Sequence, residues 1–126
     1  MRRSISKEMV GRTVKQVAIS KDKSEITFTF TEGEPLVLEA YGDCCSHTYI
    51  EGIDTPDNLL GVVRSVEHVD MPEPRKEKDD CEVTDYYGMR IVTDKGHAVI
   101  DYRNDNNGYY GGSLLIKGCS DWETTI

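Results

Sequence analysis

At 126 residues, the chain is long enough to bury one hydrophobic core and too short for two. Hydrophobic residues make up only 37% of it, and the formal net charge is −8, with an isoelectric point near 4.8. This acidity argues against binding to nucleic acid polymers or anionic membranes, because their phosphates would repel the protein. It leaves two kinds of partner, a basic protein or a small anionic ligand held in a local arginine-lined pocket.

Targeting signals are not evident in the sequence. No apolar run approaches the roughly 20 residues needed to span a bilayer, and Arg2 and Arg3 are not followed by the apolar core of a secretory signal. We therefore expect a cytoplasmic protein with no membrane partner. In that reducing compartment the cysteines are expected to be thiols rather than disulfides: Cys44, Cys45, Cys81 and Cys119.

The first half of the chain predicts an antiparallel meander. Residues 14–20, 25–31 and 36–41 read as strands, separated by polar turns. The middle strand alternates most clearly, with Ile26 and Phe28 on one face and threonines on the other. Such alternation is typical of a sheet with one buried and one solvated face.

The centre of the chain predicts one or two short helices. Ser46 is the predicted N-cap of the first, since Tyr49, Ile50 and Ile53 follow at helical spacing. A second helix is predicted over 55–61, where a threonine cap precedes a proline and a glycine closes the segment.

The second half predicts further strands over 62–69, 82–93, 97–102 and 109–117. A charged loop is expected at about 70–81, and an Asn/Gly-rich turn at 104–108. The predicted fold class is α+β: a single domain over 1–126 with an antiparallel, mostly meander β-sheet and one or two short central helices. Exposed edge strands and a lean core predict a homodimer or a higher oligomer.

The segment between the third strand and the first predicted helix holds one group of candidate ligand-binding residues: Asp43, Cys44, Cys45, Ser46 and His47. At a helix N-terminus, free N–H groups and the helix dipole would hold an anion or activate a thiol. Alternatively, Asp43 and Ser46 cap the helix and one cysteine fills a gap in the core.

Zinc binding and nucleophilic catalysis are both weaker interpretations of these residues. Structural zinc sites use paired ligands at short spacing, but the chain has no Cys-x-x-Cys, and Cys81 and Cys119 are isolated. No spacing selects a triad of nucleophile, base and orienting group either. We assign no catalytic residue, metal or cofactor, and we favour a binding protein over an enzyme.

A second group of candidate ligand-binding residues lies in the segment 101–112: Arg103, Asn104, Asn107, Tyr109 and Tyr110. Arginine binds phosphate or carboxylate, tyrosine stacks on planar groups or anchors interfaces, and asparagine reads polar edges. Alternatively, this segment is a hairpin turn whose tyrosines pack on their own sheet. The excess of tyrosine over phenylalanine predicts a partner-facing aromatic surface that also includes Tyr41, Tyr49, Tyr86 and Tyr87.

The run Leu38-Glu39-Ala40-Tyr41-Gly42-Asp43-Cys44-Cys45-Ser46, with Tyr49 and Ile50 after it, resembles the hallmark of a small uncharacterised domain family of phages, prophages and some bacteria. The stretches 91–96, 102–104 and 107–112 are similar to its C-terminal half. The family supplies no activity to carry over.

The resemblance implies a phage accessory protein in the cytoplasm of the host cell. Such a protein would counteract host defence by sequestering a small nucleotide-type signal, as a sponge, or by binding a host protein. Two alternatives remain: a cysteine-dependent protein that uses Cys44 and Cys45 as thiols or zinc ligands, and a structural, oligomeric interaction protein.

Overall fold

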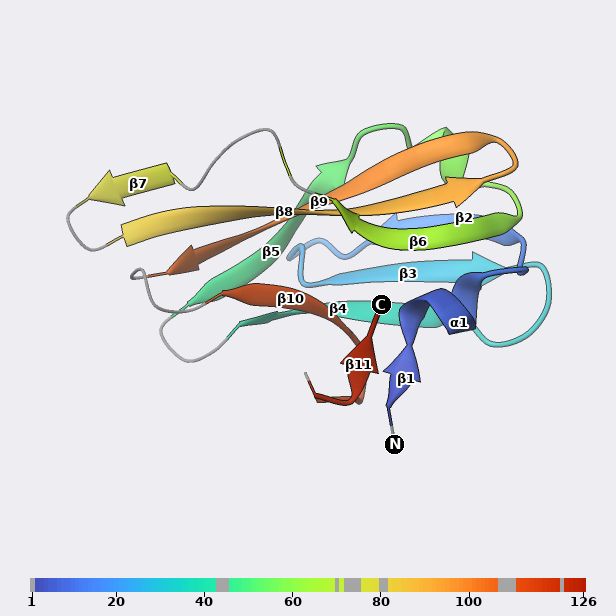
Figure 1. Cartoon of the computed structure of the whole chain (residues 1–126), viewed down its shortest axis with the longest axis horizontal. Coiled ribbons are helices and arrows are strands. Elements are labelled where there is room, and N and C mark those ends of the chain that lie inside the picture. Colours follow the sequence, from blue (N-terminus) through green and yellow to red (C-terminus); the bar gives the residue numbers. More distant parts are fainter. Residues whose placement is uncertain are drawn as a thin grey trace.

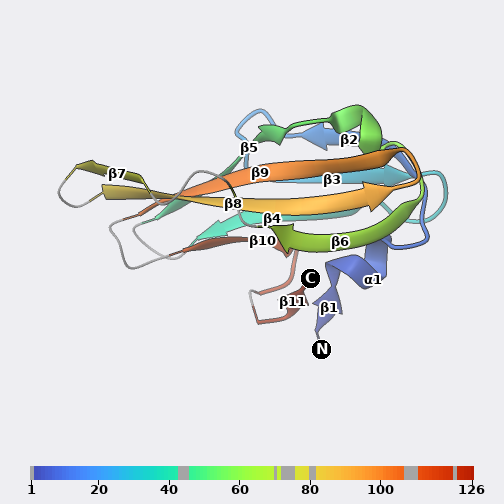
Figure 2. The same ribbon diagram turned by 45° about the horizontal axis from the view of Figure 1, so that its top comes forward.

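A computed structural model of the chain describes residues 2–42, 46–69, 71, 76–79, 82–106, 111–120 and 122–126. Within these residues, two antiparallel β-sheets pack face to face, and a short parallel ribbon lies beside them (Figures 1 and 2). The fold is therefore a β-sandwich in which the two layers bury their apolar faces against each other.

The first sheet has the strand order β10-β4-β3-β2. Its strands are β2 (Val14–Ile19), β3 (Glu25–Phe30), β4 (Leu36–Gly42) and β10 (Gly112–Ile116). The predicted meander is confirmed for β2, β3 and β4, which pair in chain order. In the middle strand β3, Ile26, Phe28 and Phe30 all face the core. Strand β10 comes from the far end of the chain and extends this sheet beside β4.

The second sheet has the strand order β5-β9-β8-β6. Its strands are β5 (His47–Ile53), β6 (Val63–Val69), β8 (Glu82–Thr93) and β9 (Gly96–Asn106), and β7 (Lys76–Asp79) pairs with the start of β8. Strands β8 and β9 form the long central hairpin of this sheet, which turns at Gly96 with φ of 134°.

Small elements close the side of the sandwich. Strand β1 (Arg3–Ser4) pairs in parallel with β11 (Thr124–Thr125), so the two ends of the chain lie side by side (Figure 1). Helix α1 (Ile5–Met9) follows β1, and the Ser4 side chain caps it by accepting a hydrogen bond from the backbone N–H of Lys7 at 3.1 Å. The 3₁₀ helix η1 (Pro56–Leu59) connects β5 to β6.

The core between the sheets changes character along β9. Its inward side chains begin with Ala98 and Ile100, which are fully buried among the apolar residues of both sheets. Tyr102 follows, where burial raises the pKa of the phenol to about 12. The next inward residues are Asn104 and Asn106, both buried. One end of the interior is thus apolar and the other is built from hydrogen-bonded polar groups.

The predicted α+β class is wrong, because the structure is all-β. The segment expected to begin a helix at Ser46 is strand β5, and the second expected helix is only the four-residue η1. The sequence of residues 47–53 is compatible with both a helical and a strand periodicity. Ile50 and Ile53 have helical spacing, while the buried Thr48 and Ile50 alternate with His47 and Tyr49 as in a strand. Pairing with β9 over the full length of β5 decides in favour of the strand.

Two other local expectations also need correction. The predicted loop at 70–81 contains strand β7, which pairs with β8. The turn predicted over 104–108 is wrong for Asn104 to Asn106, which belong to β9, and the rest of it lies outside the described residues. Asparagine favours turns because its amide competes for backbone groups, but here the Asn104 and Asn106 amides bond to each other in the interior.

Candidate functional site

Four of the predicted site residues lie at one end of the sandwich, where β5 begins and β9 ends. Ser46 precedes β5, His47 pairs with Asp105, and Asn104 pairs with Thr48 beside Arg103. The antiparallel pairing of β5 with β9 thus brings together two sequence segments that are more than 50 residues apart. The remaining predicted site residues lie outside the part of the chain that the structure describes: Asp43, Cys44, Cys45, Asn107, Tyr109 and Tyr110.

Asn104 belongs to a chain of hydrogen bonds inside the sandwich. Its side-chain amide donates to the Thr48 hydroxyl at 2.7 Å, and that hydroxyl donates to the backbone carbonyl of Tyr41 at 2.9 Å. The amide of Asn106 donates to the Asn104 side-chain oxygen at 2.7 Å and to Asp85 at 3.0 Å. Because Asn104 is fully buried, its amide joins the two sheets and does not face a ligand.

A pair of glycines in the first sheet makes room for this network. Gly42 and Gly112 are register partners in β4 and β10. A Cβ on Gly42 would lie 2.6 Å from the Thr48 hydroxyl, and one on Gly112 would lie 2.5 Å from it. These distances are too short for any side chain, so both positions require glycine for the close approach of the sheets. We call Gly42 and Gly112 the glycine pair.

Arg103 lies on the outer face of the second sheet, on the side of β9 that is opposite the buried Asn104. Register pairs Tyr49 of β5 with Arg103 of β9, and Arg103 with Tyr86 of β8. The three side chains follow one line across the sheet, on the face turned away from the core. We call Tyr49, Arg103 and Tyr86 the cross-strand row.

Arg103 is held firmly within this row. Its Nε and Nη2 donate to the two carboxylate oxygens of Asp101 at 3.2 and 3.1 Å, and its guanidinium carbon lies 4.8 Å from the centre of the Tyr86 ring. The hydrogen bond to Asp101 raises the pKa of the guanidinium, and the charges of Asp101 and Glu51 act in the same direction. The cation is thus fixed by a side-chain ion pair and an aromatic ring.

The row is flanked by further polar and aromatic groups. The His47 ring stacks on the Tyr49 ring with centroids 5.4 Å apart, and the Thr84 hydroxyl donates to Asp105 at 2.7 Å in the neighbouring register. On the other flank, the Met71 sulfur covers Gly88, where a Cβ would lie 2.6 Å from it. Aromatic, carboxylate and thioether groups therefore adjoin on one sheet face.

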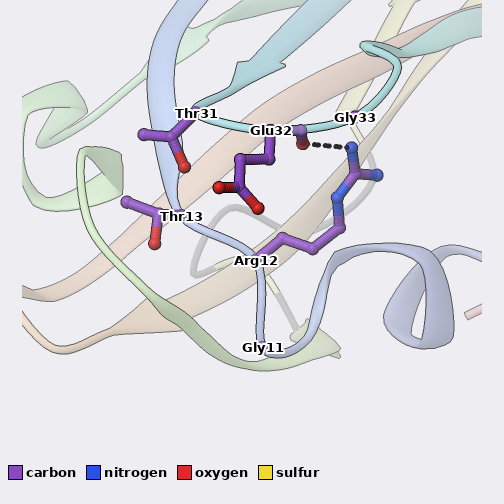
Figure 3. Close-up of a pocket in the computed structure, with 6 residues that line it drawn as sticks. All are labelled: Gly11, Arg12, Thr13, Thr31, Glu32 and Gly33. Carbon is purple, nitrogen blue, oxygen red and sulfur yellow. Dashed lines mark hydrogen bonds between the residues drawn. The ribbon is translucent and has the colours of Figure 1, made fainter.

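A surface pocket lies at the other end of the strands, around the β3–β4 turn (Figure 3). It has a volume of about 460 Å³ and is lined by Gly11, Arg12, Thr13, Thr31, Glu32 and Gly33. The Arg12 guanidinium donates to the backbone carbonyls of Glu8, Glu32 and Glu34 at 3.1, 3.2 and 2.6 Å. These hydrogen bonds connect the β3–β4 turn to helix α1 through Arg12. We therefore interpret this pocket as a consequence of the fold.

The described residues contain no arrangement that supports the cysteine-dependent or metal-binding hypotheses. Cys119 is the only cysteine among them, and its sulfur lies 3.8 Å from Arg3 Nη1, next to the Arg3–Glu8 ion pair. Among the described residues, no three His, Cys, Asp or Glu side chains gather closely enough to hold a metal ion. In the same part of the chain, no helix has the length and apolar character needed to cross a bilayer.

Sequence reasoning found Arg103, Tyr49 and Tyr86 separately but not the row that they form. Ile50 and Met89 face the core, so alternation along β5 and β8 places Tyr49 and Tyr86 on the outer face. That signal was available once both segments were read as strands. Asp101 was missed as a partner of Arg103, although the two are i and i+2 in a strand and must share a face.

Comparison with known proteins identifies a family and nothing closer. Residues 7–116 match the family described as "Domain of unknown function (DUF7448)". No curated protein and no solved structure matches the chain. The expected resemblance to an uncharacterised domain family is thus confirmed, and the matched range contains both the glycine pair and the cross-strand row.

Proposed function

The chain belongs to this domain family of unknown function, and we propose from its own geometry that it is a non-enzymatic binding protein for a partner protein. The observation that carries the proposal is the cross-strand row, in which Arg103 is held between Tyr49 and Tyr86 on the outer face of the second sheet. Tyrosine, arginine and methionine are the residues that protein interfaces favour, and Met71 completes that set beside the row.

Preorganisation of the row supports binding. Arg103 already has its ion pair and its ring contact, and the His47 and Tyr49 rings are already stacked. Fewer rotamers have to be fixed when a partner arrives, so less conformational entropy is lost on association. Strands β5, β9 and β8 carry these side chains on paired backbone rather than on loops.

A nucleotide-type ligand is the second candidate, and Arg103 is the residue that favours it. The Asp101 carboxylate already occupies two of its donors, so a phosphate would have to compete with that carboxylate. For this reason we rank the partner protein first. From the resemblance of residues 38–46 to a phage-associated family, we propose that the partner is a protein of the bacterial host and that binding counteracts host defence.

The test is site-specific photo-crosslinking. We would place p-benzoylphenylalanine at His47, which is exposed beside the row, and at Ala18, which is exposed on the first sheet, and irradiate each protein in bacterial lysate. A discrete protein adduct is expected from position 47 alone, and Arg103→Ala should reduce it about tenfold. Equal adducts from both positions, or an adduct insensitive to Arg103→Ala, would contradict the proposal. Nucleotide mass retained in native mass spectrometry would instead support the second candidate.

A further inference from the structure

Among the side chains that the structure describes around the cross-strand row, carboxylates outnumber cations. Arg103 is the cation of the row and pairs with Asp101, and Glu51 is exposed on the neighbouring edge strand β5. Asp105 adds a third carboxylate on the same face, one register further along β9 and opposite the exposed His47. Asp101 therefore neutralises the Arg103 charge, and the other carboxylates give the described part of the face a negative charge.

This surplus discriminates among possible occupants of the face. An anionic ligand would have to compete with Asp101 for Arg103 and would be repelled by the charge of Glu51. A second copy docked on the same face in a two-fold dimer would bring the same carboxylates together, and like charges repel. A cationic group gains from both the carboxylates and the aromatic rings.

We infer that the cross-strand row receives a cationic segment, rich in arginine or lysine, of a partner protein; this rests on the proposed function. An arginine or lysine of that segment lies against the stacked His47 and Tyr49 rings and pairs with Glu51 at the exposed edge of β5. Apolar stems of the same side chains pack on Met71 beside Gly88. The net charge of −8 for the whole chain favours the approach of such a partner.

The experiment uses fluorescein-labelled octa-arginine and octa-glutamate peptides as probes, with binding followed by fluorescence anisotropy. It is done with the full chain in about 150 mM NaCl, where the Debye length of about 8 Å screens distant charges. We expect octa-arginine to bind and octa-glutamate not to bind. The double variant Glu51→Gln/Asp101→Asn should weaken octa-arginine binding about tenfold, because it removes the carboxylate that pairs with Arg103 and the exposed carboxylate of β5.

A matched control separates this site from the general acidity of the protein. The double variant Glu34→Gln/Asp57→Asn removes the same charge from exposed positions at the other end of the sandwich. We expect it to weaken octa-arginine binding about twofold or less. Equal weakening by the two double variants, or comparable binding of octa-glutamate, would overturn the inference.

Failure of this inference can be told apart from failure of the proposed function. If position 47 crosslinks to a partner in an Arg103-dependent manner but the two double variants bind octa-arginine equally, the row is a protein-binding surface and the cationic segment is wrong. If crosslinking is absent as well, the proposed function is wrong. Thermal unfolding of each variant checks that it is folded before its binding is compared.

Discussion

Arg12 and Arg103 each place a guanidinium over an aromatic ring, but they lie at opposite ends of the strands and have different partners. Arg12 lies 3.6 Å from the Phe30 ring centre and donates to three backbone carbonyls. Arg103 lies 4.8 Å from the Tyr86 ring centre and donates to one carboxylate side chain. The first arginine ties chain segments together, whereas the second organises side chains on a surface.

This difference separates an arginine that stabilises the fold from one that we propose to take part in binding. Carbonyls of a turn cannot leave their arginine without rearranging backbone, so Arg12 is committed to the fold. Asp101 and Tyr86 hold Arg103 through side chains alone, so a partner could contact Arg103 without any rearrangement of backbone. The two roles are distinguished by the type of hydrogen-bond acceptor, backbone carbonyl or side-chain carboxylate, and not by the contact with an aromatic ring.

The largest expected effect comes from filling the glycine pair, which lies at the same end of the sandwich as the cross-strand row. Gly112→Val would drive a side chain into Thr48, whose hydroxyl lies 2.5 Å from the Cβ position. We expect a loss of about 3 kcal/mol in the free energy of unfolding, because the buried network cannot move aside without breaking hydrogen bonds. Urea denaturation measures the change.

Gly52→Val is the matched control for that substitution. Gly52 lies in β5 and has nothing within 4 Å of its Cβ position. We expect its effect to stay within about 0.5 kcal/mol. A Gly112→Val protein as stable as the control would show that the sheets do not approach as closely at Gly112 as the structure indicates.

The second effect compares the two arginines directly. Arg12→Ala removes charge-assisted hydrogen bonds to three carbonyls, so we expect it to lower the free energy of unfolding by about 2 kcal/mol. Arg103→Ala removes a part-exposed ion pair and a ring contact, for which about 0.5–1 kcal/mol is expected. Only Arg103→Ala should affect crosslinking at position 47. Equal losses of stability would remove the distinction between the two arginines.

The regular parts of the fold were predictable from the sequence because they follow single-strand alternation. In β3, Ile26, Phe28 and Phe30 fix one buried face whatever the partner strand is. In β5, two periods overlap, and the choice between helix and strand depends on β9, which lies some 50 residues later. No local pattern contains that information.

The candidate site was predictable in its residues and not in its layout. Arg103 and Asn104 were predicted together as ligand contacts, yet neighbours in a strand face opposite ways. Asn104 therefore joins the buried network with Thr48, while Arg103 joins the outer row. The glycine pair was hidden for a related reason, since Gly42 and Gly112 become neighbours only through the β4–β10 register.

The smallest effect is expected from Arg90, and it tests how far the proposed binding surface extends beyond the cross-strand row. Arg90 lies on the same outer face as Arg103, and its guanidinium pairs with Glu67 at 2.5 Å, but both side chains are more than 40% exposed. It has a carboxylate partner and, among the described contacts, no aromatic ring beneath it. We expect Arg90→Ala to change the free energy of unfolding by less than about 0.5 kcal/mol, because exposed ion pairs contribute little.

Crosslinking at position 47 should stay at the wild-type level, since Arg90 is outside the cross-strand row. A loss as large as that of Arg103→Ala would mean that the whole outer face, and not the row, recognises the partner.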